Sequence, residues 1–378
     1  MKKIIILLLI LLQIFNLAIA EEEISLNDIL KIDEDSDQGV VIEAEDIPEF
    51  FKEPDIHEAD GSVQIVITAA GDVTIGGDVR SKKKSLFDKE LEKQGGDLGF
   101  PFRNVLDIFQ NDDMTLVNFE GTLTTAPINR DKKNNQFLFS APPEYVEMLT
   151  KSSIEAVALE NNHVLDHGEA GLEETIKTLE EAGIVYSTAK QMGVYTVKGV
   201  DIAMLSYQTF NGLYPKLFEQ VPEDVKAAKE KFPIVITSFH WGEEKDYWPN
   251  KNQQKLGKIA VDAGADLVLG HHSHRINPIE EYKGKYIVYS LGNCSFAGNN
   301  KPSDMSTFMF QIRFKVLNGV AAYNGFRIIP ARISSRTDYN DFAITPYDKQ
   351  VNIEFLLSTL EKNGKHIENP VEYYPTDW

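Results

Sequence analysis

Between residue 62 and about residue 300, short β-type segments alternate with amphipathic helical segments, and this alternation constrains the fold more than any other feature. The first segment, residues 63–68, is rich in β-branched residues and leads into Gly71 and Asp72. Alternating strands and helices are typical of layered α/β domains, so we expect one such domain over residues 61–335. Its strands are expected at residues 115–119, 155–159, 201–206, 234–239, 267–269 and 286–290, and its helices at 102–110, 144–152, 169–182, 221–231 and 252–263.

The pattern changes after this region. Apolar residues alternate with polar ones through residues 306–334, which predicts antiparallel strands that close the domain. Residues 336–378 contain one helical stretch, at about 349–362, and then a proline-containing end. We expect this C-terminal extension to pack on the domain.

The N-terminus has the pattern of an export signal. Two lysines precede an apolar run, and Ala18 and Ala20 place small residues at positions −3 and −1 of a cleavage site. These features predict a signal peptide over residues 1–20; the alternative is an uncleaved segment that anchors the chain in a membrane. The protein is therefore expected to be exported and to be secreted, periplasmic or at the cell surface. Cys294 is the only cysteine, so the exported fold is expected to hold no intrachain disulfide.

An acidic segment follows the predicted signal. Residues 21–60 hold 16 Asp and Glu against two Lys and show little periodicity, which predicts a disordered tether. The whole chain carries a net charge of −20 and shows no basic stripe. This charge argues against nucleic acid as a partner.

Five polar motifs come directly after expected strands. In open α/β sheets, the carboxyl ends of the strands are where binding sites form. Six of the eight histidines lie in these motifs or beside them. The motifs are Gly71-Asp72-Val73-Thr74, Asn118-Phe119-Glu120-Gly121, Glu160-Asn161-Asn162-His163, His240-Trp241-Gly242 and Gly270-His271-His272-Ser273-His274.

Imidazoles and carboxylates that converge at such an edge can bind divalent cations, and one carboxylate can bridge two of them. His272 and His274 suit this role, since alternate residues of an extended segment face the same side. Asn162 offers an oxygen ligand, and His163 offers an imidazole that can protonate a leaving group.

Each motif taken alone also admits a structural role. Asp72 can cap a turn, Glu120 can lie in a surface turn, and His240 can be a buried, hydrogen-bonded histidine. A glycosidase with paired carboxylates is a further alternative, but it leaves the histidines without a role. Three histidines in four residues have few structural uses, so a shared metal site is favoured.

The motifs, in this order, resemble those of the bacterial capsule synthesis protein CapA family, which takes part in poly-γ-glutamate capsule formation. The domain of that family is similar to a divergent calcineurin-like metallophosphoesterase. The resemblance extends from about residue 63 to residue 296 and includes Ser290-Leu291-Gly292-Asn293. It implies a metallophosphoesterase-like β-sandwich core with helices on both outer faces, in α-β-β-α layers.

The resemblance also implies a site for one or two divalent metal ions, Mn, Fe or Zn. Thr74 stands where such enzymes usually have a histidine, and Asn118 and Glu120 stand where an aspartate is usual. The implied metal ligands are Asp72, Glu120, Asn162, His240, His272 and His274; the implied catalytic residues are His163 and Asn162; further pocket residues are Asn118, His271 and Trp241.

The sequence thus predicts an exported cell-envelope protein of the capsule or poly-γ-glutamate synthesis type, with a metal-dependent, phosphoesterase-like hydrolase site. Its expected partners are a membrane capsule synthase or export complex and an anionic polymer or phosphoester substrate. Two alternatives remain: a non-catalytic scaffold that binds the polymer or its synthase, and a metal-dependent γ-glutamyl amide hydrolase.

Overall fold

The computed structural model describes residues 56–78, 84–127 and 137–378. The predicted signal peptide and most of the predicted acidic tether lie outside the described residues, and both stay predictions. The end of that tether is described, and His57 forms an isolated bridge with Val63. Among the described residues, no helix combines the length and the apolar character needed to cross a bilayer.

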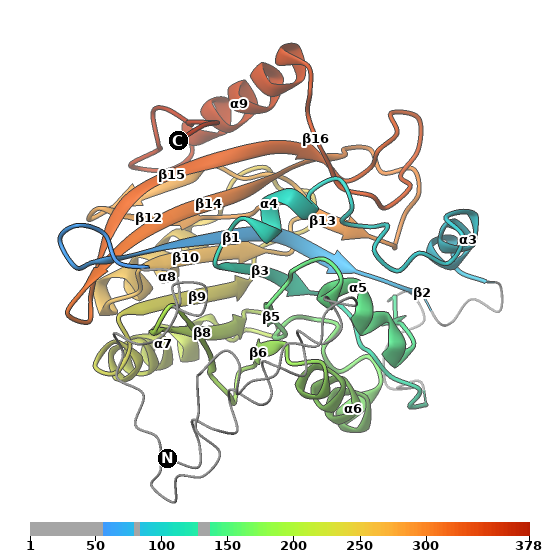
Figure 1. Ribbon diagram of the computed structural model, residues 1–378, viewed down its shortest axis with the longest axis horizontal. Helices are drawn as coiled ribbons and strands as arrows, with labels where there is room; N and C mark the ends of the chain where they lie inside the picture. The colour runs from blue at the N-terminus through green and yellow to red at the C-terminus, as the bar shows by residue number, and fades with distance from the viewer. Residues whose placement is uncertain (1–55, 79–83, 128–136) are drawn as a thin grey trace, which may run out of the picture. The chain divides into compact units, whose positions relative to one another are not determined.

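The first of two large sheets has the strand order β16-β15-β14-β1-β3-β5-β6, and β13 also pairs with β1 (Figure 1). Strands β1, β3, β5 and β6 are parallel, whereas β14, β15 and β16 are antiparallel to their neighbours. The antiparallel strands expected in residues 306–334 are thereby confirmed. The bounds are β1 (Val63–Thr74), β3 (Met114–Phe119), β5 (Ala156–Ala158), β6 (Val185–Ser187), β13 (Asn293–Phe296), β14 (Ser306–Leu317), β15 (Val320–Arg332) and β16 (Thr345–Pro346).

The second sheet has the order β11-β12-β10-β9-β8-β7, with a parallel centre of β8, β9, β10 and β12. A small ribbon pairs β2 (Gly77–Asp78) with β4 (Phe139–Ser140). The bounds in the second sheet are β7 (Gly193–Val197), β8 (Val200–Gln208), β9 (Ile234–His240), β10 (Leu267–His271), β11 (Ile279–Tyr282) and β12 (Lys285–Val288).

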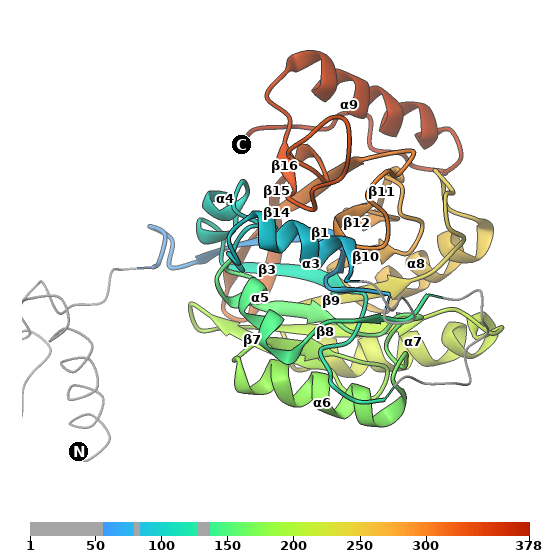
Figure 2. The same cartoon turned by 90° about the vertical axis from the view of Figure 1, so that its right-hand side faces the viewer.

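Helices cover the outer face of each sheet (Figure 2). Helices α3, α4, α5 and α6 pack on the first sheet, and α7 and α8 pack on the second. The bounds are α3 (Leu86–Lys93), α4 (Leu106–Gln110), the 3₁₀ turn η3 (Pro143–Val146), α5 (Glu147–Thr150), α6 (Gly168–Glu181), α7 (Tyr214–Lys229), α8 (Lys251–Ala263) and α9 (Gln350–Gly364).

Side-chain alternation along the strands produces three apolar layers. In β1, Ile65 and Ile67 face the core between the two sheets, whereas Ala70 faces the helices outside. In β9, Ile236 faces that same inner core and Val235 faces α7 and α8. Both faces of both sheets are therefore covered, as expected for strands that are apolar on both sides. The α-β-β-α layering predicted for this chain is confirmed.

Helix α7 begins earlier than the sequence indicates. Its expected start was at residue 221. The helix instead begins at Tyr214 and runs through Pro222, although proline lacks an N–H donor and normally ends or kinks a helix. Leu217, Val221 and Val225 recur every four residues and are buried against the second sheet. Burial of this apolar stripe offsets the lost hydrogen bond.

The C-terminal segment joins the edges of the two sheets. Leu356 and Leu360 of α9 enter the apolar core between the sheets, and α9 lies along β15 (Figure 1). Further along, the Val371 N–H donates to the Ile279 carbonyl at the edge of the second sheet. The buried Glu280 carboxylate holds this segment too, since it accepts from Asn369.

Asp112, two residues before β3, is a half-buried carboxyl whose protonation should affect stability. Burial raises the pKa of its carboxyl to about 7, against hydrogen bonds from Thr68 and Thr115. This folded pKa exceeds the unfolded value of about 3.9, so the protonated Asp112 carboxyl is favoured in the folded state. Its contribution to stability is complete below pH 4 and is lost as pH rises through 7. Asparagine cannot ionise, so Asp112→Asn should stabilise the protein at pH 8, where the half-buried aspartate is charged. We expect about 1–3 kcal/mol, less than the pKa difference alone would give, because solvent partly reaches this carboxyl.

Urea unfolding at pH 5 and pH 8 measures this effect. The gain of Asp112→Asn should be clearly smaller at pH 5, and the exposed Asp107→Asn should show no such dependence. An equal gain at both pH values would contradict the assignment.

Candidate metal centre

The polar motifs meet at one end of the two-sheet core. Strands β1, β3 and β5 of the first sheet and β9 and β10 of the second end there, and the arrowheads of β1, β3 and β9 point the same way in Figure 1. Asp72 lies near the end of β1, Glu120 follows β3, and His240 and His271 end β9 and β10. Each sheet therefore contributes side chains to a common site.

Two glycines allow the chain to approach closely behind this site. A Cβ on Gly71 would lie 2.0 Å from the Gly292 carbonyl oxygen, and one on Gly270 would lie 2.1 Å from the Tyr289 carbonyl oxygen. The Asp72 N–H donates to the Gly292 carbonyl at 3.0 Å. Residues 289–293 thus pass directly behind both Asp72 and the start of the histidine motif, and only glycine leaves room for them.

Glu120 lies at the centre of the cluster. One group of possible ligand atoms joins Glu120, His240 and His272, and a second joins Asp72, Glu120 and His274, each within 4.8 Å. Glu120 Oε1 lies 3.6 Å from His240 Nε2. Since Glu120 belongs to both groups, it is the residue that would be shared if a cation were held by each group.

Asp72 is fixed from several sides. Asn118 Nδ2 donates to its Oδ1 at 2.8 Å, and the backbone N–H of His272 donates to its Oδ2 at 3.2 Å. His271 Nδ1 lies 3.1 Å from Oδ1, and His274 Nδ1 lies 3.5 Å from Oδ2. Burial alone would raise the pKa of Asp72, but His271 and His274 outweigh it and hold that pKa well below its usual range. Asp72 is therefore ionised, and its oxygens can act as ligands of a cation.

His272 and His274 converge in a different way from the one the sequence indicates. The expectation was an extended segment, and this is wrong, because His272 has φ +93° and His274 has φ +52°. Such left-handed conformations cost of order 1–3 kcal/mol each in non-glycine residues and concentrate at functional sites. The turn brings the two ring centroids to 6.1 Å.

Burial keeps two of the histidines neutral. His272 Nδ1 lies 3.1 Å from His240 Nε2. Burial, with the neighbouring His272, lowers the pKa of His240 well below its usual value; burial, with His274, lowers the pKa of His272 to about 3. For His274, burial is outweighed by Glu120 and Asp72, which raise its pKa to about 9. Neutral imidazoles are the form that binds metal ions.

Glu120 is the member of the cluster that most requires a partner. Burial raises the pKa of its carboxyl well above the usual range. Its Oε2 is buried and has no hydrogen-bond partner among the described residues. A buried oxygen left in this state is costly unless a cation or donor satisfies it. Carboxylate oxygens with imidazole nitrogens form a donor set that suits Mn, Fe or Zn, so the residues present fit a divalent metal.

His163 is oriented by Asp166. His163 Nδ1 lies 2.7 Å from Asp166 Oδ2, which also accepts from the Phe139 N–H at 2.6 Å. The opposite ring nitrogen, Nε2, lies 3.8 Å from Glu120 Oε1 and therefore faces the centre of the cluster. The sequence pattern contains Asp166 three residues after His163, but its orienting role emerges only from the structure.

The remaining predicted site residues differ in placement. Asn162 is half-buried in the turn after β5, beside Asn161, whose side chain donates to the Phe119 carbonyl and so ties this turn to β3. Trp241 is not brought to the cluster. It is fully buried in the apolar layer that α7 and α8 form on the second sheet, and its indole N–H donates to the Tyr289 carbonyl.

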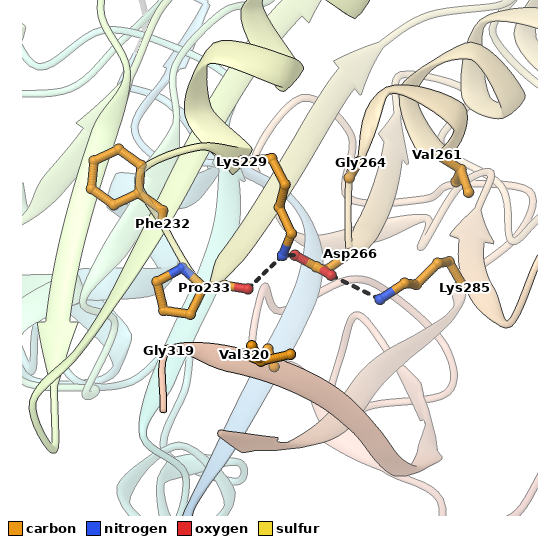
Figure 3. Close-up of a pocket in the computed structure, with 11 residues that line it drawn as sticks. Lys229, Phe232, Pro233, Val261, Gly264, Asp266, Lys285, Gly319 and Val320 are labelled. Atoms are coloured by element: carbon orange, nitrogen blue, oxygen red, sulfur yellow. Dashed lines mark hydrogen bonds and ion pairs between the residues drawn. The ribbon is translucent and has the colours of Figure 1, made fainter. Parts of the chain in front are cut away.

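A separate cavity of about 360 Å³ lies at the opposite end of the second sheet, around Asp266 (Figure 3). Lys229 Nζ lies 2.6 Å from one Asp266 oxygen, and Lys285 Nζ lies 2.8 Å from the other. Lys229 also donates to the Pro233 carbonyl. The charged groups of this cavity therefore pair with one another.

A two-sheet α/β domain with buried carboxylates and imidazoles at the ends of its strands defines a candidate metalloprotein. Residues 66–297 match the family described as bacterial capsule synthesis protein PGA_cap, and this range contains all five polar motifs. The chain belongs to this family, as its motifs predict.

Two curated relatives agree with this membership. The PGA biosynthesis protein CapA of Bacillus subtilis is 32% identical over 228 residues, which cover 55% of this chain and 59% of that protein. The capsule biosynthesis protein CapA of Bacillus anthracis is 30% identical over 278 residues, covering 66% and 64%. The chain thus spans less than two thirds of the length of these relatives. The calcineurin-like phosphoesterase YfkN of Bacillus subtilis aligns with 80% of this chain and 99% of its own, at 15% identity and a TM-score of 0.41.

Gly71→Ala tests the close approach behind the site. The added methyl group would collide with the Gly292 carbonyl, so we expect a loss of about 2–3 kcal/mol in unfolding free energy, measured in urea. Gly121→Ala is the matched control: it also adjoins a cluster residue, but its Cβ would meet only Phe139 at 3.6 Å. Equal losses for the two variants would show that the Gly292 contact is not the cause.

Proposed function

We propose that this protein is an exported component of capsule or poly-γ-glutamate assembly and that its buried cluster is the centre of a metal-dependent hydrolase. The observation that carries the proposal is Glu120, a buried carboxylate shared by two groups of ligand atoms and left with one unsatisfied oxygen. Family membership and the predicted signal over residues 1–20 support the cellular role.

The cluster divides into two ligand groups around the shared carboxylate. Asp72 and His274 lie on one side of Glu120, and His240 and His272 lie on the other. Divalent ions held there would supply Lewis acidity and a water of lowered pKa. Asn118 keeps Asp72 in place through its hydrogen bond, and Asn162 lies in the adjoining turn as a further oxygen donor.

His163 is placed to handle the leaving group. When Asp166 accepts a hydrogen bond from Nδ1–H, the tautomer of His163 is fixed and Nε2 faces the cluster. In the protonated ring, Nε2 can donate its proton to the oxygen or nitrogen released when water adds to the substrate and the ester or amide bond breaks. The Phe139 ring, 4.5 Å from the imidazole, excludes water from one side.

Two substrate classes suit this chemistry. A phosphoester is the first, because metal ions and a neighbouring imidazole stabilise the charge of phosphoryl transfer. A γ-glutamyl amide is the second, and the names of the two Bacillus relatives, which refer to PGA and capsule biosynthesis, favour it. In either case the substrate is anionic, and bound cations would offset the acidity of this chain. A scaffold without turnover is the outcome expected if the cluster binds no metal.

Metal content is the direct test of the centre. Elemental analysis of the purified full chain should find about one or two equivalents of Mn, Fe or Zn, because Glu120 Oε2 is buried without a hydrogen-bond partner among the described residues and the surrounding imidazoles complete a suitable donor set. His272→Ala with His274→Ala should remove the metal. The control is His366→Ala, which alters a ring stacked on Trp248 outside the cluster. No bound metal after loading with each ion would refute the hydrolase proposal and favour the scaffold.

His163→Gln separates catalysis from metal binding. The variant should keep its metal, since His163 is outside both ligand groups, but lose about 10²–10⁴-fold in kcat on phosphoester or γ-glutamyl amide substrates. Asp166→Asn should show a smaller loss, because it removes only the orienting acceptor. A variant that loses metal, or one with unchanged kcat, would contradict the role of His163 in protonating the leaving group.

A further inference from the structure

The turn that carries His272 and His274 is held mainly through its backbone. The His272 N–H donates to Asp72, and the Ser273 carbonyl accepts from the Lys245 N–H at 2.7 Å. The His274 carbonyl accepts from Nη1 of Arg275 at 2.7 Å. In the last of these contacts the donor is the side chain of Arg275, which also donates to Ser303 on another segment of the chain.

Arg275 is a buried cation with partners on two further segments. Only 8% of the residue is exposed. Its Nη2 donates to Ser303 Oγ at 3.0 Å, and its Nε lies 4.0 Å from Asp304 Oδ2. The guanidinium also lies 5.7 Å from the ring centroid of Tyr247, whose hydroxyl donates to Asp304 Oδ2 at 2.6 Å. Arg275, Tyr247, Ser303 and Asp304 form one unit, which we call the arginine clamp.

We propose that Arg275 is a positioning residue that holds the His274 backbone and thereby presents His272 and His274 to the metal centre. This inference rests on the proposed function. It follows from the conformation of the turn: both histidines have positive φ, and a strained backbone persists only where its surroundings fix it. Asn293 fixes the ring of His274 at 2.8 Å, and Arg275 fixes its carbonyl.

The chemistry of arginine suits this task better than that of lysine. A planar guanidinium donates in two directions at once, here to the His274 carbonyl and to Ser303. A buried cation also requires a nearby anion, and Asp304 provides it. Tyr247 in turn holds Asp304, so the clamp ties the loop after β9 to the histidine turn.

Charge and position predict opposite effects on metal affinity. Arg275 is positive and lies next to His274, so its charge alone would oppose the binding of a cation, and its removal would tighten binding. If Arg275 acts by position, its removal weakens binding instead, since the turn relaxes and His272 and His274 leave their places. The direction of the change therefore identifies the role.

The experiment titrates Mn²⁺ or Zn²⁺ into metal-free full-length protein by calorimetry. We expect Arg275→Ala to weaken binding by about 10–100-fold, the range for residues that orient metal ligands. Arg275→Lys should recover part of this loss, because one ammonium can still reach the His274 carbonyl. Arg336→Ala removes an exposed arginine paired with Asp338 and should leave the affinity unchanged.

Thermal unfolding of each metal-free variant verifies that it is folded. If Arg275→Ala does not fold, Tyr247→Phe replaces it: this variant removes only the hydroxyl that holds Asp304 and should weaken binding by a few-fold. Unchanged or tighter binding by the folded Arg275→Ala, or wild-type affinity in both Arg275→Lys and Tyr247→Phe, would overturn the inference. A wild-type protein that binds no metal would refute the proposed function itself, and the positioning role with it.

Discussion

The close passage of residues 289–293 behind the site is the constraint on which the rest of the structure depends. This segment leaves the second sheet after β12 and enters the first sheet as β13, where Asn293 pairs with Asp72. Gly71 and Gly270 allow it to lie against both sheets at once. Because one short segment fixes the ends of β1 and β10 together, Asp72 and the histidine turn are close before any ligand binds.

This close packing buries two carboxyl groups, Asp72 and Glu120, and burial disfavours their charged forms. Neighbouring histidines compensate fully for only one of them. Asp72 is balanced by His271 and His274, which hold its pKa low despite burial. Glu120 lacks such a balance, and burial raises its pKa. Within the two ligand groups, the first sheet supplies the carboxylates and the second supplies the imidazoles. A cation bound between them would therefore favour the packed state of the two sheets over any state in which they separate.

The sequence predicts the strands and the location of the cluster because both depend on local pattern, whereas the α-β-β-α layering is what the family resemblance implies. Apolar periodicity identifies the strands, and polar residues at the carboxyl ends of parallel strands, such as Asp72 and His240, meet at one edge of each sheet. It does not predict the positive φ of His272, the hydrogen bond of Asp166 to His163, or the contact of Arg275 with Ser303. These depend on tertiary contacts between segments far apart in the chain.

Asn118 and Glu120 stand where metallophosphoesterases usually have an aspartate, and their contacts show why the carboxylate lies at the second position rather than the first. Asn118 lies beside Asp72 and donates to it at 2.8 Å, so an aspartate there would place two carboxylates in contact within a buried site. The carboxylate stands instead two residues further along, at Glu120, where it faces both groups of imidazoles. At Thr74, by contrast, the side chain is fully buried in β1, and no hydrogen bond joins its hydroxyl to the other described residues. In this cluster, an amide therefore orients one carboxylate, and a longer acidic side chain belongs to both groups of possible ligand atoms.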